Sequence, residues 1–203
     1  MPKMDNQGTL KILDICAAPG GKSMLAADIL NHADIDYMLE ARDISEYKVE
    51  LMQENFNRCH LNKAKAVAWD ALEPDERWLG QADVVIADIP CSGLGVIGRK
   101  RDIKYKMTPQ AVQDIVELQE KILKVAASYV KKGGKLLFST CTVNKDENEA
   151  HVKWIQDTLK MTPVSLNGTL PGLVHSPTTQ QGFVQLIPGM QDTDGFFISV
   201  FEK

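Results

Sequence analysis

The sequence has no apolar run that approaches the roughly 20 residues needed to cross a membrane. Its first residues, MPKMDNQGT, lack the basic and then apolar pattern of a secretory signal. The four cysteines form no Cys-x-x-Cys pair and have no histidine at ligand spacing, so no metal site is expected. These absences favour a cytoplasmic protein without a membrane or metal partner, in which an unusual cysteine serves chemistry rather than a disulfide.

The composition is that of an ordinary globular protein. Of the 203 residues, 44% are hydrophobic and 25% are charged. No repeat, low-complexity tract or linker divides the chain, so we expect one domain over residues 1–203. A net charge of −4 gives no overall signal for nucleic acid, and any such site must come from a local cluster of basic residues.

Short β-rich runs alternate with helical patterns along the chain. Strands are expected over residues 10–16, 36–43, 64–70, 82–90, 134–141 and 195–203. Apolar spacing predicts helices over residues 44–56 and 115–129, the second one preceded by the N-cap pair Thr108-Pro109. This alternation predicts an α/β domain with a mostly parallel sheet covered on both faces.

Two further segments carry specific expectations. A helix is expected to begin at Asn144, with Glu147 as the partner in a capping box. Residues 168–182, rich in Pro, Gly and Thr, are expected to form one long loop that serves as a lid or binding loop.

The stretch CAAPGGKS, residues 16–23, ends like a phosphate-binding P-loop. A P-loop requires G-x-x-x-x-G-K-S/T, but Cys16 occupies the position of the first glycine. The dinucleotide fingerprint G-x-G-x-x-G is absent as well. The stretch therefore predicts a tight glycine turn between the first strand and a helix, which binds something other than a triphosphate.

Acidic residues follow three of the expected strands. Asp43, Asp70 and Asp88 come at successive strand ends, where the ligands of such sheets bind. Asp43 lies about 20 residues beyond the glycine turn, the spacing of a carboxylate that binds ribose hydroxyls. Acids at strand ends also cap the next helix, but three of them beside a glycine turn favour a nucleoside ligand. S-adenosylmethionine fits because it contains adenosine and no phosphate.

Two cysteines also follow strands, in ADIPCSGLG and FSTCT. Cys91 and Cys141 are expected near the reactive methyl group, where a thiolate could add to C6 of a pyrimidine and activate C5. Asp88 could stabilise that adduct, and the dipole of a helix beginning at Asn144 would lower the pKa of Cys141. Spacing alone does not decide which cysteine is the nucleophile, and buried free cysteines are common.

Five segments, DICAAPGGK, DIPCSGLGV, RKRDIKY, STCTVNKDENE and DGFFISVFEK, resemble the bacterial RsmB (Sun/Fmu)-type cytosine-5 RNA methyltransferases, in order and over nearly the whole chain. The resemblance implies a class I, Rossmann-like methyltransferase fold with seven strands and an antiparallel C-terminal strand. It implies that Cys141 is the nucleophile and that Cys91 helps release the product. The implied cofactor contacts are Cys16, Ala17, Ala18, Pro19, Gly20, Gly21, Lys22, Asp43, Asp70 and Asp88.

The same resemblance predicts ribosomal RNA as a partner. Relatives carry an N-terminal RNA-binding region, whereas only 13 residues precede Asp14, so a separate RNA-binding domain or protein is expected. A basic cluster after Cys91 could hold phosphates while an aromatic ring stacks on a base, the alternative being a solvated loop. The cluster consists of Arg99, Lys100, Arg101, Lys104 and Tyr105.

The expected reaction is methyl transfer from S-adenosylmethionine to C5 of a cytosine in small-subunit ribosomal RNA. One alternative is the same chemistry on transfer RNA. Another is a cofactor-binding module that is inactive without its RNA-recognition part.

Overall fold

The protein is described by a computed structural model that covers residues 8–169 and 177–203. The strands are β1 (Leu10–Asp14), β2 (Tyr37–Asp43), β3 (Ala64–Ala68), β4 (Ala82–Asp88), β5 (Val130–Thr140), β6 (Thr162–Pro163), β7 (Phe183–Leu186) and β8 (Phe196–Glu202). The α-helices are α1 (Gly21–His32), α2 (Glu46–Arg58), α3 (Ile103–Lys106), α4 (Pro109–Tyr129), α5 (Glu149–Leu159) and α6 (Pro177–Gln180). Short 3-10 turns cover Glu76–Trp78 and Leu94–Val96.

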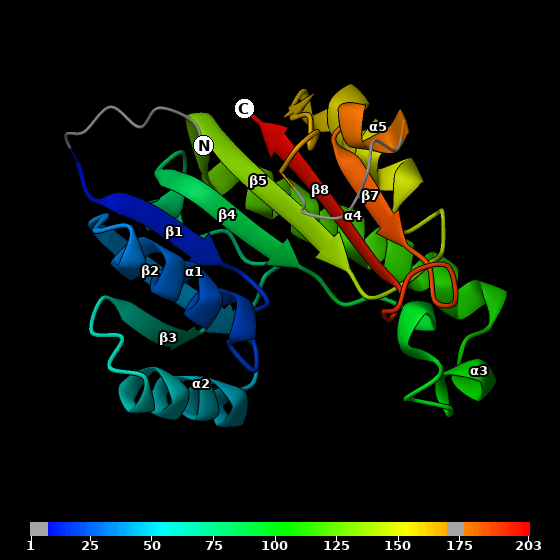
Figure 1. Ribbon diagram of the computed structural model, residues 1–203, viewed down its shortest axis with the longest axis horizontal. Coiled ribbons are helices and arrows are strands. Elements are labelled where there is room, and N and C mark those ends of the chain that lie inside the picture. Colours follow the sequence, from blue (N-terminus) through cyan, green and yellow to red (C-terminus); the bar gives the residue numbers. More distant parts are fainter. Residues whose placement is uncertain (1–7, 170–176) are drawn as a thin grey trace.

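All strands belong to one sheet, in the order β3-β2-β1-β4-β5-β8-β6, with β7 also paired to β8 (Figure 1). The strands from β3 to β5 run parallel, and β8 runs antiparallel to β5. The predicted mostly parallel α/β fold with an antiparallel C-terminal strand is therefore confirmed. The described residues form eight strands rather than the expected seven, because the short strands β6 and β7 both pair with the outer edge of β8. Pro163, which has no N–H to donate, lies on this edge strand.

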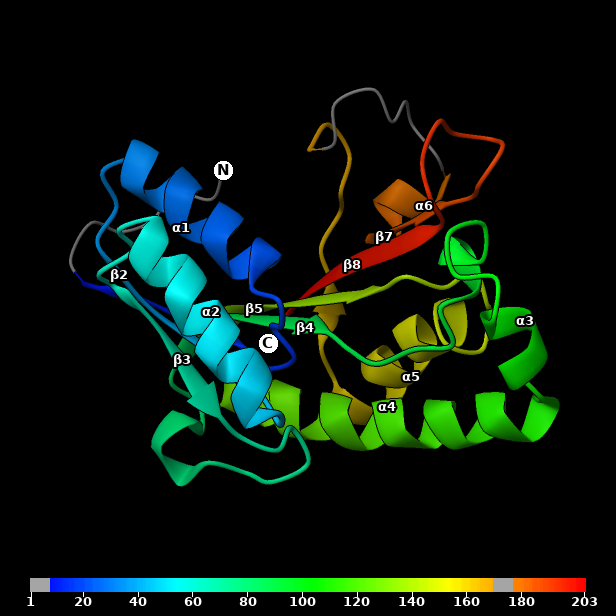
Figure 2. The same ribbon diagram turned by 90° about the horizontal axis from the view of Figure 1, so that it is seen from below.

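Helices cover both faces of the sheet, as the alternating pattern predicts (Figure 2). On one face α1 and α2 enclose a core that includes Leu39, Met52 and Phe56. On the other face α4 and α5 enclose a larger core that includes Leu123 and Phe138. Since both faces are buried, the central strands read as continuous apolar runs rather than as an alternating pattern.

The expected strands and two of the expected helices are present, with ends shifted by a few residues. The predicted cap of α4 is confirmed, because the Thr108 hydroxyl accepts a hydrogen bond from the Ala111 N–H at 3.1 Å. The predicted helix start at Asn144 is wrong, since α5 begins at Glu149. The Asn144 side chain instead accepts from the Asp146 N–H at 2.8 Å, which closes a local turn, and Glu147 is fully buried.

The long loop expected over residues 168–182 is present only in part. Residues 170–176 lie outside the described residues, and the segment after them contains the short helix α6 and leads into β7. Within the described ranges, no helix is long and apolar enough to cross a membrane.

A buried histidine couples the stability of the fold to pH. His151 in α5 is 1% exposed between the rings of Phe138 and Trp154, at 5.9 and 6.1 Å between centroids. Its Nε2 atom has no hydrogen-bond partner among the described residues, and burial lowers the pKa of His151 to about 4.

We expect the contribution of His151 to the free energy of unfolding to fall as the pH drops from about 6.5 to 4, by about 1.4 kcal/mol per pH unit at most. The reason is that the unfolded chain binds a proton at residue 151 in this range and the native chain does not. Urea titrations between pH 4 and 7.5 measure the slope, and the difference in slope between the wild type and His151→Gln is this contribution. Burial raises the pKa of Asp14 to about 7 and gives a slope of opposite sign, but Asp14 is present in both proteins and cancels in the difference. The exposed His32 provides the control, and a slope that His32→Gln reduces equally would contradict this assignment.

Candidate active site

A cavity of about 500 Å³ opens at the carboxyl ends of the parallel strands. This volume is in the range of small-molecule sites, and the position is where ligands of open α/β sheets bind. The topology brings together, around this cavity, residues that the sequence places far apart. The predicted site residues that line it are Cys16, Ala18, Asp43, Asp70, Asp88, Cys91 and Cys141.

The glycine turn after β1 forms the floor of this cavity at Cys16 and Ala18. Its shape is fixed by two backbone hydrogen bonds, from the Ala17 N–H to the Arg42 carbonyl at 2.7 Å and from the Gly20 N–H to the Ala17 carbonyl at 2.6 Å. Gly20 has a φ of 97°, in the region that favours glycine. The other predicted cofactor residues of this turn are not among the lining residues: Ala17, Pro19, Gly20, Gly21 and Lys22.

Two carboxylates and two apolar side chains are arranged to receive a nucleoside. Asp43 accepts from the Ser45 N–H at 3.1 Å, and Asp70 accepts from the Leu72 N–H at 2.9 Å. Both bonds use Oδ1, so within the described part of the chain Oδ2 of each carboxylate remains for a ligand. Ile44 and Leu72 line the same cavity with apolar surface. These residues therefore fit the ribose and base of S-adenosylmethionine.

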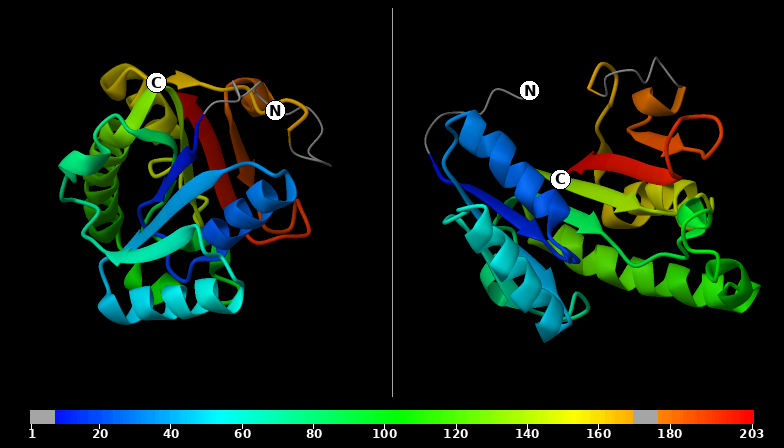
Figure 3. Two further views of the ribbon diagram at one scale, coloured as in Figure 1. Left: turned by 90° about the vertical axis from the view of Figure 1, so that its left-hand side faces the viewer. Right: turned by 60° about the horizontal axis from the view of Figure 1, so that its bottom comes forward.

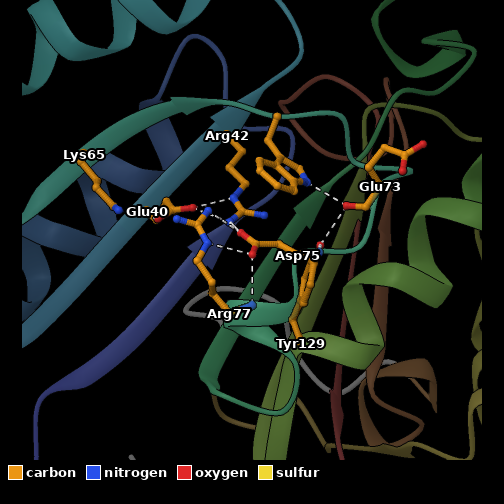
Figure 4. Close-up of polar contacts among 8 residues, drawn as sticks. Glu40, Arg42, Lys65, Glu73, Asp75, Arg77 and Tyr129 are labelled. Carbon is orange, nitrogen blue, oxygen red and sulfur yellow. Dashed lines mark hydrogen bonds and ion pairs between the residues drawn. The ribbon is translucent and has the colours of Figure 1, made fainter.

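A buried ion network supports the wall that carries Asp70 (Figure 4). Arg42, at 1% exposure, donates to Glu40 at 2.7 Å and to Asp75 at 2.5 Å. Its guanidinium lies 4.9 Å from the Trp69 ring, and the Asp75 N–H donates to the Tyr129 hydroxyl at 2.9 Å. Hydrogen bonds from Arg77 and Arg42 hold the pKa of Asp75 well below its usual range. The network fixes the segment from Trp69 to Asp75, and no local motif in the sequence predicts it.

The two cysteines after β4 and β5 are in contact with each other in the lining of the cavity. Their Sγ atoms are 3.3 Å apart, and both side chains are half-buried. The hydrogen bond from Cys91 lowers the pKa of Cys141 to about 7, against the effects of burial and of Asp88. The same hydrogen bond, with burial, raises the pKa of Cys91. The pair thus favours a thiolate at Cys141 and a thiol at Cys91.

The predicted cause of the low pKa at Cys141, the dipole of a helix that begins at Asn144, is wrong. The effect of a helix dipole falls off within about one turn, and α5 begins only at Glu149. The pKa of Cys141 is lowered instead by the hydrogen bond with the neighbouring Cys91 thiol.

Asp88 ends β4 and lies beside both cysteines. Its Oδ2 accepts from Lys22 Nζ at 2.6 Å, and its Oδ1 accepts from the Ser139 hydroxyl at 2.8 Å. Lys22 therefore reaches this site as the partner of Asp88. Asp14, which the sequence reading missed, accepts from the Ser23 hydroxyl at 2.7 Å, and burial raises its pKa to about 7. Asp14 is the last residue of β1, so the strand-end position that identified Asp43, Asp70 and Asp88 could also have identified it.

Close backbone contacts hold the cysteine loops together. The Gly95 N–H donates to the Cys141 carbonyl at 3.1 Å, and the Gly195 N–H donates to the Gly95 carbonyl at 2.8 Å. A Cβ atom on Gly95 would lie 2.8 Å from the Cys141 carbonyl oxygen, closer than real contacts allow. Glycine is therefore required at this point in the DIPCSGLG segment.

The predicted basic cluster is exposed on the segment around α3, which stands away from the sheet beyond β4 and β5 (green in Figure 3). Tyr105 is 79% exposed, with Lys104 Nζ 4.7 Å from its ring centroid. Arg99 forms an ion pair with Asp194 at 3.0 Å. The charge of Lys100 contributes to the low pKa of Cys141, so this end of the cluster lies toward the cysteine pair.

No group of three or more potential ligands among the described residues is arranged to hold a metal ion.

The sheet topology, the cavity at the carboxyl ends of the parallel strands and the likeness to a solved methyltransferase homologue define the chain as a Rossmann-like, class I methyltransferase domain. A protein family described as 16S rRNA methyltransferase RsmB/F matches residues 2–202, and the chain belongs to this family. The predicted family is therefore confirmed, as is S-adenosylmethionine as its cofactor.

Individual relatives agree with this assignment. The chain is 37% identical to the probable ribosomal RNA small subunit methyltransferase B of Bacillus subtilis, over 98% of this chain and 44% of that protein. It is 28% identical to the ribosomal RNA small subunit methyltransferase F of Escherichia coli, over 98% and 41% of the two chains. The chain thus spans about two fifths of the length of these relatives.

Solved structures give the same picture. The crystal structure of NSun6 from Pyrococcus horikoshii with SFG has a TM-score of 0.79 and 28% identity, over 95% of this chain and 47% of that one. A methyltransferase homologue from the same organism has a TM-score of 0.79 and 25% identity, over 97% and 62% of the two chains.

Proposed function

We propose that this chain transfers a methyl group from S-adenosylmethionine to C5 of a cytosine in small-subunit ribosomal RNA, through a covalent bond between cysteine and cytosine. The observation that carries the proposal is the pair of Sγ atoms 3.3 Å apart, in a cavity that Asp88 also lines. The names of the relatives support ribosomal RNA as the substrate. We further propose that residues 1–203 act as one domain, and the cytoplasmic location expected from the sequence stays a prediction.

The chemistry requires a nucleophile because C5 of cytosine is itself a poor one. The Cys141 thiolate adds to C6, which pushes electron density through the ring to C5 and N3. Asp88 stabilises the protonated N3 of the attacked base, and Lys22 and Ser139 hold its carboxylate in place. When bound, S-adenosylmethionine supplies the electrophilic methyl group that C5 attacks.

Release of the product requires two further events. The proton on C5 passes to water, and the electron pair of that C–H bond then restores the C5–C6 double bond as the Cys141 thiolate is expelled. Cys91, a thiol because its pKa is raised, lies beside the sulfur that departs, and its S–H can stabilise the expelled Cys141 thiolate by a hydrogen bond. We assign it to this release step. The low pKa of Cys141 supports its role as nucleophile, since the thiolate is the reactive form of cysteine.

The cofactor roles follow from the positions around the cavity. Asp43 binds the ribose hydroxyls, Asp70 accepts from the exocyclic amine of adenine, and the turn of residues 16–22 packs against the methionine part. Each of these roles is a proposal for a named side chain.

The test is methyl transfer from tritium-labelled cofactor to naked small-subunit ribosomal RNA and, separately, to transfer RNA. We expect label at C5 of one cytosine in the ribosomal RNA. Label in transfer RNA alone would move the assignment to that substrate. Cofactor binding without transfer to either RNA would identify a module that requires a separate RNA-recognition part.

We also propose that the basic cluster holds RNA phosphates. The K100Q/R101Q double variant should bind RNA more weakly, with a slope of log affinity against log salt that is smaller by about 1 to 2, because fewer counterions are released. Filter binding at several salt concentrations measures this slope. The K131Q/K132Q variant is the control, because it also removes two positive charges but at the start of β5, at the opposite end of this strand from Cys141. It should leave the slope unaltered. If both variants show the same salt dependence of RNA affinity, the cluster does not bind RNA and is an ordinary solvated loop.

A further inference from the structure

A buried carboxylate lies behind the two cysteines and has no place in the chemistry derived above. Glu147 is 0% exposed, although it carries an ionisable group. Burial of a carboxylate is costly unless hydrogen bonds compensate for it. Glu147 therefore requires an explanation, and the capping-box role expected from the sequence does not supply it because α5 starts after it.

The hydrogen bonds of Glu147 connect the residues that follow the two cysteines. Its Oε1 accepts from the Ser92 hydroxyl at 2.5 Å, and its Oε2 accepts from the Ser92 N–H at 2.8 Å. The Thr142 hydroxyl lies 2.8 Å from the Ser92 hydroxyl and 3.4 Å from Glu147 Oε1. Ser92 follows Cys91 directly, and Thr142 follows Cys141 directly. The carboxylate thus joins one cysteine loop to the other.

The directions of these bonds follow from their geometry. Because the Ser92 hydroxyl donates its proton to Glu147, it must accept from Thr142, whose hydroxyl oxygen in turn accepts from the Asn144 N–H at 3.2 Å. Successive hydrogen bonds therefore run from the Asn144 N–H through the Thr142 and Ser92 hydroxyls to the Glu147 carboxylate. The direction of these bonds is fixed because Glu147 is their final acceptor.

A third element is tied to the same carboxylate. Gln119 in α4, also 0% exposed, donates from Nε2 to Glu147 Oε2 at 3.1 Å and to the Pro90 carbonyl at 2.9 Å. Its Oε1 is left buried without a partner among the described residues. The Gln119 amide nitrogen faces both acceptors, and this orientation leaves its Oε1 unpaired. Since buried polar atoms are rarely unpaired, the orientation indicates that Gln119 serves these two hydrogen bonds and not packing alone.

We infer that Glu147 is a positioning residue that clamps the Cys91 loop to the Cys141 loop and so sets the contact between the two sulfur atoms. The inference deepens the proposed function, because it rests on Cys141 and Cys91 acting as a pair. Glu147 itself touches neither sulfur in this role and acts through Ser92 and Thr142.

The clamp has a signature that a simple loss of charge would not produce. The charged and titratable groups that act on Cys141 are Cys91, Asp88 and Lys100. Removing a nearby carboxylate charge by itself would favour the thiolate and lower the pKa of Cys141. Releasing the clamp separates the sulfur atoms, removes the hydrogen bond from Cys91 and raises that pKa.

The experiment measures alkylation of Cys141 by iodoacetamide against pH, resolved by mass spectrometry, in Glu147→Ala and in the wild type. We expect the Glu147→Ala curve to move to higher pH and the rate at pH 7 to fall about fivefold or more, as a rise of one pKa unit from about 7 requires. The exposed Glu149→Ala, two residues on, is the matched control and should follow the wild type. Faster or unchanged alkylation in folded Glu147→Ala would overturn the clamp.

Should Glu147→Ala fail to fold, as judged by circular dichroism, Ser92→Ala carries the same comparison. It removes the hydroxyl link and should slow alkylation in the same direction, whereas an unchanged curve would overturn the inference. Alkylation requires neither RNA nor cofactor. A shifted curve in a protein that methylates no RNA would therefore retain the clamp and reject the proposed function.

Discussion

Cys141→Ala is expected to abolish turnover and every covalent adduct with RNA, whereas Cys91→Ala should accumulate an adduct. The reason is the order of the two steps. Without the Cys141 sulfur no bond to cytosine C6 forms, and C5 never becomes nucleophilic. Without Cys91 the Cys141 thiolate still attacks, but the methylated base is not released from it. The 3.3 Å separation of the sulfur atoms supports a division of labour between adjacent thiols.

The comparison uses tritium-labelled cofactor and target RNA, with adducts resolved on denaturing gels. Cys59→Ala is the control, because this exposed cysteine lies at the end of α2, away from the cavity, and should behave as the wild type. Since Cys91 donates the hydrogen bond that lowers the pKa of Cys141, Cys91→Ala should also attack more slowly near pH 7 than at pH 9. An adduct in Cys141→Ala that is absent from Cys91→Ala would exchange the two roles.

The sequence predicts which residues meet at the site when each of them lies at the carboxyl end of a parallel strand. Asp43, Asp70 and Asp88 come at the ends of parallel strands, and parallel strands end at one edge, so their convergence follows from the alternating pattern. The two cysteines converge for the same reason, because β4 and β5 are neighbours in the sheet.

Features that depend on side-chain contacts between distant segments could not be predicted in this way. Glu147 fits the local pattern of a capping box, yet its partner, Ser92, is 55 residues away. Nothing in the sequence around Arg42 indicates its partners, and only the fold places Asp75 and three aromatic rings around it. In each case a buried charge finds compensation across the structure, and periodicity carries no information about such a partner.

The second large effect expected concerns the cofactor rather than the RNA. Asp43→Asn should weaken binding of S-adenosylmethionine by about 1–3 kcal/mol, or roughly 5- to 150-fold in Kd, through loss of charge-assisted hydrogen bonds to the ribose. Asparagine keeps an oxygen that can accept from the Ser45 N–H, so the turn that leads into α2 survives and the change reports on the ligand. Calorimetry with the cofactor, and with ATP as a ligand expected not to bind, measures the effect. Glu46→Gln removes an exposed charge three residues further along the chain and should bind normally. Equal affinity for wild type and Asp43→Asn would show that Asp43 does not bind the ribose and serves only the turn before α2.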